Sequence, residues 1–164
     1  MTAQKSKRPR GVVDTSVLVA GIAGFKSTGF KSTGFRSTKI APKNPSAYLL
    51  RDWIEEGRFV WLVSDEILLE YKRVLGRLGV RRPLIGKIIN LLREEAELVP
   101  TSALPSISPD PGDDPFCGCA EAGRADFIVT LNPKDFPQTL LSAHVIKPGE
   151  DVPTTARRKP RLWV

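Results

Sequence analysis

The fold is decided by residues 11–23, which read GVVDTSVLVAGIA. This segment begins as a short β-branched run, passes through Asp14, and continues as an apolar stretch typical of a helix. The same alternation recurs along the chain and predicts helices at 45–57, from 64, at 82–95 and at 114–123, and strands at 58–63, 97–99, 127–130 and 144–146. Strands separated by helices pair in parallel through right-handed crossovers. We therefore predict a three-layer α/β/α sandwich around a central, mainly parallel sheet of four or five strands.

Length and composition limit the class of protein. The chain has 164 residues, of which 41% are hydrophobic, and this is sufficient for one compact domain. No apolar run approaches the ~20 residues of a membrane-spanning helix, so an integral membrane protein is excluded. Cys117 and Cys119 lie too close together to staple distant parts of a fold, and residues 1–10 lack the apolar centre of a secretory signal. These features favour a cytoplasmic protein.

The net charge of +7 is distributed unevenly. Thirteen of the 25 basic residues fall in three segments without any acid, 1–10, 24–43 and 157–164, whereas the remaining 12 stand against all 18 acids. Basic arms of this kind commonly follow the backbone of a nucleic acid. We expect a basic N-terminal arm at 1–10, a folded domain at 11–148 with a basic insert at 24–43, and a basic tail at 149–164.

The insert contains a five-residue repeat in three copies at residues 24–38, Gly-Phe-Lys/Arg-Ser-Thr. A phenylalanine separates each glycine from its basic residue, so the spacing does not match a phosphate-binding P-loop. Basic residues that alternate with aromatic rings are typical of surfaces that bind single-stranded nucleic acid. The candidate RNA-binding residues are Lys26, Lys31 and Arg36.

Two carboxylates occupy positions that indicate either a functional or a structural role. Asp14 directly follows the first strand, at the edge of the sheet where α/β proteins bind their ligands, although it is equally suited to cap the next helix. Glu70 lies at the border of an apolar helical stripe, which indicates either a partly buried functional acid or a surface pair with Arg73.

Further polar residues surround the later elements. Asp114 with Pro115 forms a strong helix start, and Asp113 precedes it. Asn132 leaves the fourth predicted strand at its carboxyl end, whereas Asp126 begins that strand roughly 13 Å away. His144 lies within a predicted strand and does not complete a zinc site or a catalytic triad with the two cysteines.

These motifs together resemble the PIN domain. The resemblance covers about residues 11–148 without the insert, and it is carried by Asp14-Thr15-Ser16 after a strand, Ser64 to Glu70 opening a helix, Asp113-Asp114, and the segment from Ala125 to Pro137. Within that family, the chain is most similar to the toxin components of toxin–antitoxin systems, the VapC-like ribonucleases.

The resemblance implies a PIN-like fold and a metal-dependent ribonuclease that cleaves single-stranded RNA. Asp14, Glu70 and Asp114 match the three principal acids and would bind the metal, and Asn132 stands where many members have a fourth acid. Oxygen ligands without histidine or thiolate suit Mg²⁺ or Mn²⁺. The resemblance further implies an antitoxin protein and a homodimer as partners. Supporting site residues are Thr15, Ser16, Asp113, Thr130 and Asp135.

Two other functions remain open on the sequence alone. A catalytically weak PIN-like domain that binds RNA or protein is consistent with Asn132 at the fourth position. A phosphatase of the haloacid dehalogenase type also has an aspartate after its first strand, but it needs a second acid where this chain has Ser16.

Overall fold

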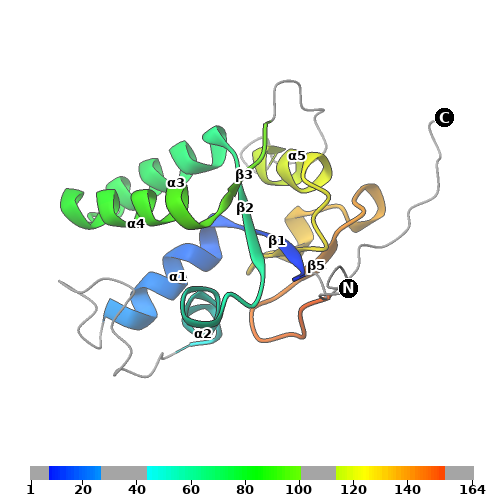
Figure 1. Ribbon diagram of the computed structural model, residues 1–164, viewed down its shortest axis with the longest axis horizontal. Helices are drawn as coiled ribbons and strands as arrows, with labels where there is room; N and C mark the ends of the chain where they lie inside the picture. The colour runs from blue at the N-terminus through cyan, green and yellow to red at the C-terminus, as the bar shows by residue number, and fades with distance from the viewer. Residues whose placement is uncertain (1–7, 27–43, 101–113, 154–164) are drawn as a thin grey trace, which may run out of the picture.

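The computed structural model describes residues 8–26, 44–100 and 114–153 (Figure 1). Within these ranges the strands are β1 (Arg10–Val13), β2 (Val60–Val63), β3 (Glu97–Leu98), β4 (Phe127–Val129) and β5 (His144–Ile146). They form one sheet in the order β3-β2-β1-β4-β5, and every neighbouring pair is parallel. The predicted parallel sheet is therefore confirmed, with β1 at its centre.

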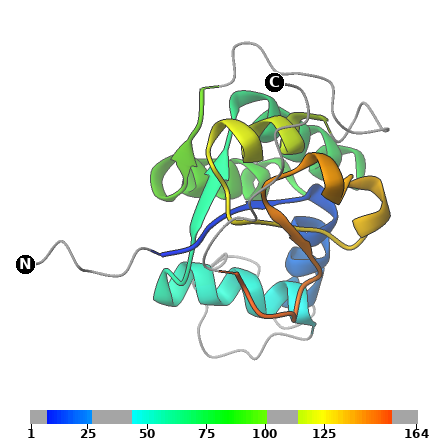
Figure 2. The same cartoon turned by 90° about the vertical axis from the view of Figure 1, so that its right-hand side faces the viewer.

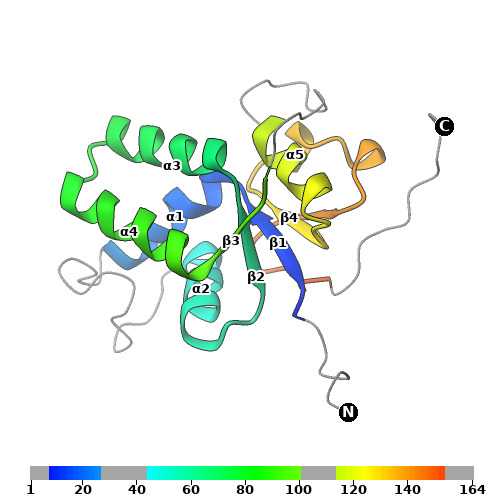
Figure 3. The same ribbon diagram turned by 45° about the horizontal axis from the view of Figure 1, so that its top comes forward.

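Helices cover the sheet and extend beside it. The helical elements are α1 (Thr15–Lys26), α2 (Pro45–Arg51), η3 (Asp52–Glu56), α3 (Asp65–Arg77), α4 (Arg82–Glu95), α5 (Asp114–Ala122), η5 (Pro133–Asp135) and η6 (Gln138–Leu140). The helix α5 lies on one side of the sheet, and α1 and α2 lie on the other (Figure 2). The helices α3 and α4 form an antiparallel hairpin next to α1 (Figure 3). This arrangement confirms the predicted α/β/α sandwich.

Most helices begin where the sequence predicts. Ser64 Oγ accepts a hydrogen bond from Ile67 N at 3.2 Å and caps α3, and α4 spans the predicted residues 82–95. The stretch predicted as one helix at 45–57 is an exception, because its last turn is the π-helix η3. The wider turn places Trp53 edge-on to Trp61 in the core, with ring centroids 4.7 Å apart. The short helix η6 was not predicted.

The core is aromatic near the middle of the sheet. Trp61, Phe59 and Phe127 are fully buried and pack ring to ring. Gly11 lies opposite Phe127 in the sheet, and a Cβ at position 11 would overlap the Phe127 ring. Glycine is therefore required at position 11 by close packing rather than by backbone conformation.

The amino-terminal edge of the sheet is held by one ion pair and a hydrogen bond from the backbone to a carboxylate. The Arg10 guanidinium donates to both carboxylate oxygens of Glu97 at 2.9 and 2.7 Å, and Arg10 N donates to Asp126 Oδ2 at 2.8 Å. The hydrogen bond to Arg10 lowers the pKa of Glu97. The placement of Asp126 away from the carboxyl edge is confirmed, because its side chain fixes the start of β1.

Several predicted features lie outside the described residues. They are residues 1–7 of the basic arm, 27–43 of the insert with Lys31 and Arg36, the loop with Asp113, and 154–164 of the tail. The predicted domain boundaries stay predictions. In the part of the chain that the structure describes, no helix is both long and apolar enough to cross a membrane.

Candidate active site

Asp14 lies at the carboxyl end of the central strand β1. Its backbone N donates to Val129 O at 2.9 Å, which extends the pairing of β1 with β4 by one residue. Only 6% of Asp14 is exposed. A carboxylate this deeply buried needs polar partners, because burial removes its hydration.

Two hydroxyls provide those partners. Ser16 Oγ donates to Asp14 Oδ2 at 2.7 Å, and Thr130 Oγ1 donates to the same oxygen at 2.8 Å. Among the described residues, Oδ1 of Asp14 accepts no hydrogen bond, and no backbone N–H of α1 bonds to the side chain. The capping interpretation of Asp14 is therefore wrong, because the helix begins on its backbone carbonyl while the carboxylate faces the two hydroxyls.

Each hydroxyl is itself oriented by the backbone after β4. Leu131 N donates to Ser16 Oγ at 3.2 Å, and Asn132 N donates to Thr130 Oγ1 at 3.0 Å. A hydroxyl that accepts from a backbone N–H has its own hydrogen directed elsewhere, in this case to Asp14. The loop that follows β4 thus fixes the position of Asp14, and Ser16 and Thr130 have a defined supporting role.

The neighbouring hydroxyl of Thr15 has no such partner. Thr15 is 9% exposed, and within the described residues its Oγ1 is buried without a hydrogen bond. An unpaired buried hydroxyl costs about 1–3 kcal/mol unless a ligand or water satisfies it. The Oδ1 of Asp14, which has no donor among the described residues, makes the edge a suitable place for a bound group that prefers oxygen ligands.

Tyr71 is buried in the core and hydrogen-bonds to the carboxyl end of β1. Its hydroxyl donates to Val13 O at 2.5 Å and accepts from Trp61 Nε1 at 3.3 Å. Complete burial raises the pKa of Tyr71 well above its usual value, and the negative charge of Asp14 adds to this shift. In the sequence, Tyr71 belongs to the apolar stripe that Glu70 borders, and nothing in that pattern indicates the partner of its hydroxyl.

Glu70 is partly buried, as predicted, with 21% of its side chain exposed. It forms an ion pair with Arg73 on the same helix. The structure therefore shows the surface pair that the sequence left open. A pair of this kind contributes only about 0.2–0.5 kcal/mol, so another ligand of Glu70 can replace Arg73 at little cost.

The other candidates are placed as follows. Asp114 is the first residue of α5, but its side chain and that of Lys26 lie outside the description. Asn132 is exposed at the start of η5, and Asp135 lies within that turn, half-buried. Among the described side chains, no three histidines, cysteines or acids gather closely enough to hold a metal ion. The ligand set of Asp14, Glu70 and Asp114 stays a prediction, because the third carboxylate is not described.

The two cysteines of α5 do not take part in this chemistry. Cys117 and Cys119 are buried and form no disulfide, and burial raises the pKa of the Cys119 thiol to about 12, helped by the charge of Glu66. A thiol with so high a pKa is neither a nucleophile nor a metal ligand near neutral pH. Among the described residues, the side-chain atoms that bond to the Asp14 carboxylate are hydroxyl oxygens.

Comparison with known proteins agrees with this picture of the fold. A family model described as PIN domain matches residues 10–134. No curated protein matches the chain. The matched residues include β1 with Asp14, the helix with Glu70, the start of α5 and Asn132.

Proposed function

The chain belongs to the PIN-domain family, whose members are generally nucleases, and from this premise we propose that it is a metal-dependent endoribonuclease that cleaves single-stranded RNA. The observation that carries the proposal is the buried Asp14 at the carboxyl edge, held by Ser16 and Thr130 with one oxygen free. Among the described residues that oxygen has no donor, and a residue needed only for folding has no reason to keep a carboxylate oxygen unpaired.

Asp14, Glu70 and Asp114 would hold Mg²⁺ or Mn²⁺, the ions that prefer carboxylate oxygens. A bound divalent ion activates water and neutralises the charge that develops on phosphate oxygens during hydrolysis. Ser16 and Thr130 keep Asp14 in one orientation, so its free oxygen does not reorganise when a ligand arrives. The Thr15 hydroxyl, at the first position of α1, can donate to an oxygen of the bound group.

Asn132 gives the site a neutral group where an acid would repel the substrate. Its side chain is exposed, and its amide can donate and accept hydrogen bonds. We assign to it contact with the phosphate or a base rather than metal binding. Asp135, in the same short turn, would orient this loop.

RNA would reach the acidic edge with the help of the basic insert. Replacing Lys26, Lys31 and Arg36 by alanine should weaken RNA binding for every sequence and reduce the slope of log K against log salt by about 0.7 per lost contact. Turnover at saturating RNA should change little, because such charges act on binding. An unchanged slope would exclude these residues from the RNA interface.

The biological setting belongs to the same proposal. We place the protein in the cytoplasm as a homodimer and as the toxin of a toxin–antitoxin pair, with an antitoxin protein as its inhibitor. The support is the similarity of its motifs to VapC-like ribonucleases. Relief of growth inhibition by a gene neighbour is the measurement that tests this role.

The decisive experiment measures cleavage of single-stranded RNA with Mg²⁺, with Mn²⁺ and with a chelator. The Asp14→Asn variant should lose activity, and the control Asp65→Asn, an exposed acid in the first turn of α3, should retain it. RNA binding without metal-dependent cleavage by the wild-type chain would instead identify a binding module. Asn132 in place of an acid is the observation that favours this second function.

A further inference from the structure

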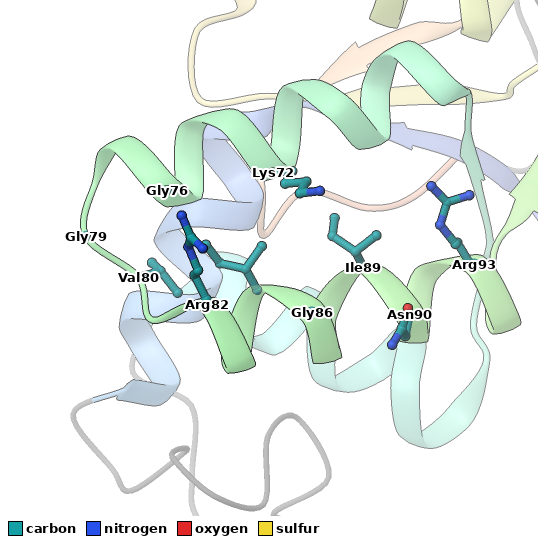
Figure 4. Close-up of a pocket in the computed structure, with 10 residues that line it drawn as sticks. Lys72, Gly76, Gly79, Val80, Arg82, Gly86, Ile89, Asn90 and Arg93 are labelled. Atoms are coloured by element: carbon teal, nitrogen blue, oxygen red, sulfur yellow. The ribbon is translucent and has the colours of Figure 1, made fainter.

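A groove of about 920 Å³ lies between α3 and α4, and the proposed ribonuclease activity does not use it. Its walls come from the second half of α3, the turn that follows, and one face of α4 (Figure 4). The lining contains three cations, Lys72, Arg82 and Arg93, and it contains no acid and no aromatic ring. None of the candidate catalytic residues is part of it.

The charge of this hairpin is unevenly distributed along its length. Residues 71–93, which include the groove, contain seven lysines and arginines and no acid, whereas the five acids of α3 and α4 lie before and after this range. The side chains of Arg82 and Arg93 extend from α4 towards α3, and both are exposed (Figure 4). Like charges held around one groove repel each other unless an anionic group lies between them. The charge therefore points to an acidic occupant.

Two glycines in the groove walls are the second observation. Gly76 lies within α3 and Gly86 within α4, where glycine is less favourable than alanine. A Cβ at either position would meet nothing within 4 Å, and neither residue has a positive φ. Internal packing and backbone conformation therefore do not require glycine at 76 or 86. What glycine provides there is room for another molecule to approach both helices.

The shape of the groove fits a helix. The floor consists of the buried Ile85 and Ile89, and Leu69, seven residues before Gly76 on the same face of α3, is 65% exposed. A helix of about 10 Å diameter and 5.4 Å pitch occupies about 420 Å³ per turn, so the groove holds about two turns. An apolar ridge of such a helix would rest on the isoleucines, with carboxylates beside the cations at the rim.

Other occupants fit less well. Single-stranded RNA binds through aromatic stacking as well as charge, and the groove offers no aromatic ring above its isoleucine floor. The segments of this chain at 1–10, 24–43 and 157–164 carry no acid, so the groove would repel them. Symmetric pairing of two copies through this groove would bring the cations of both together.

We propose that the groove between α3 and α4 is the docking site for an acidic amphipathic helix of a protein partner. This inference does not depend on the ribonuclease activity, because the groove and Asp14 share no residue.

The test uses a designed peptide with the full-length chain. The probe is a fluorescent peptide of about 15 residues, roughly four helical turns, with leucines at a spacing of three and four residues and glutamates elsewhere. Fluorescence anisotropy should show saturable binding that weakens at least about tenfold when lysines replace the glutamates. The same composition in scrambled order should also bind at least about tenfold more weakly, because it presents no apolar ridge. Equal binding of the three peptides, or no binding of the acidic one, overturns the proposal.

Substitutions of the residues that line the groove provide a more specific test. Gly76→Ala and Gly86→Ala should each raise the Tm by about 2–4 °C through helix propensity, yet weaken binding of the acidic peptide at least about tenfold. Lys72→Ala and Arg93→Ala should also weaken peptide binding. The control Arg77→Ala should leave it unchanged, because Arg77 is an exposed cation of α3 outside the groove.

Three further results would overturn the proposal. The first is unchanged peptide affinity in the stabilised glycine variants. The second is a loss of single-stranded RNA affinity in Lys72→Ala and Arg93→Ala that equals or exceeds their loss of peptide affinity, which would assign the groove to RNA. The third is a dimer in sedimentation experiments that Gly86→Ala dissociates, which would assign it to a second copy of the chain. RNA cleavage by the glycine variants should equal that of the wild-type chain, so failure here is distinguishable from failure of the proposed activity.

Discussion

The substitution Thr130→Val tests whether the hydroxyl pair holds Asp14 in place. Thr130 is fully buried, and valine has nearly the same shape, so the change removes little except the hydroxyl. The substitution removes the hydroxyl that donates to Asp14 Oδ2 at 2.8 Å, and Asn132 N loses its acceptor at 3.0 Å. A hydrogen bond to a charged group contributes about 1.5–3 kcal/mol. For a chain of this size we expect the Tm to fall by about 3–12 °C.

Activity should respond through orientation rather than through RNA binding. With only Ser16 left to hold it, Asp14 gains freedom to rotate, and kcat should fall by about 10- to 100-fold while KM changes little. Thr130→Ser keeps the hydroxyl and loses one buried methyl group, so it should cost about 1 kcal/mol of stability and retain most of kcat. Thr139→Val is the matched control, because Thr139 is exposed on η6.

The assays are thermal unfolding by circular dichroism and single-turnover cleavage of RNA. Equal kcat values for Thr130→Val and Thr130→Ser would refute the positioning role, because the two variants differ in the hydroxyl. An unchanged Tm in Thr130→Val would refute the energetic argument independently of any activity.

Four further outcomes are expected. Tyr71→Phe should lower the free energy of unfolding in urea by about 1–2 kcal/mol, because it removes the hydroxyl bond to the β1 carbonyl. Arg10 lowers the pKa of Glu97 below its usual 4.5, so this pair stabilises the fold above that pH and should lose its effect as the pH falls through the lowered pKa. Glu97→Gln should therefore remove this small part of the acid sensitivity in thermal melts. Cys119, with its pKa raised to about 12, should resist iodoacetamide at about pH 8 until denaturant is added, as mass spectrometry can show. Asp14→Asn should leave the fold intact but abolish the stabilisation that we expect from Mg²⁺ in the wild-type chain, about 2.7 kcal/mol at 100 times Kd, as thermal melts with and without the ion can show.

The order of elements could be predicted from the sequence because it depends on local patterns. The β-branched runs gave the strands, and capping residues such as Ser64 gave the helix starts. Boundaries differed by one or two residues, as at β2, where pairing begins at Val60 rather than at 58. The π-helical turn η3 could not be predicted, since Trp53, which it places against Trp61, has no contact with β2 until the sheet forms.

The candidate site was predictable in part for a related reason. The position of Asp14 after a strand placed it at the carboxyl edge, and the border of the apolar stripe indicated that Glu70 is partly buried. The resemblance named Ser16 and Thr130 as supporting residues, but the hydrogen bond from Thr130 could not be predicted, because Thr130 is 116 residues from Asp14 and meets it only through the pairing of β1 with β4. Tyr71 was missed because a buried tyrosine in an apolar stripe gives no sign of which carbonyl its hydroxyl will reach.

Asp14 and Asp126 show how strand direction separates two acids with different hydrogen-bond partners. Both lie at ends of the adjacent parallel strands β1 and β4, and both side chains accept hydrogen bonds. Asp126 lies at the amino-terminal edge, where its carboxylate accepts the backbone N–H of Arg10 and so completes the pairing of the strands. The backbone N–H of both acids donates across the two strands, from Asp14 to Val129 O and from Asp126 to Arg10 O, so the difference lies in the side chains. Asp14 lies at the carboxyl edge, where among the described residues its side chain accepts hydrogen bonds only from the hydroxyls of Ser16 and Thr130. At the amino-terminal edge a strand N–H therefore uses the carboxylate, whereas at the carboxyl edge a carboxylate oxygen can bind a ligand.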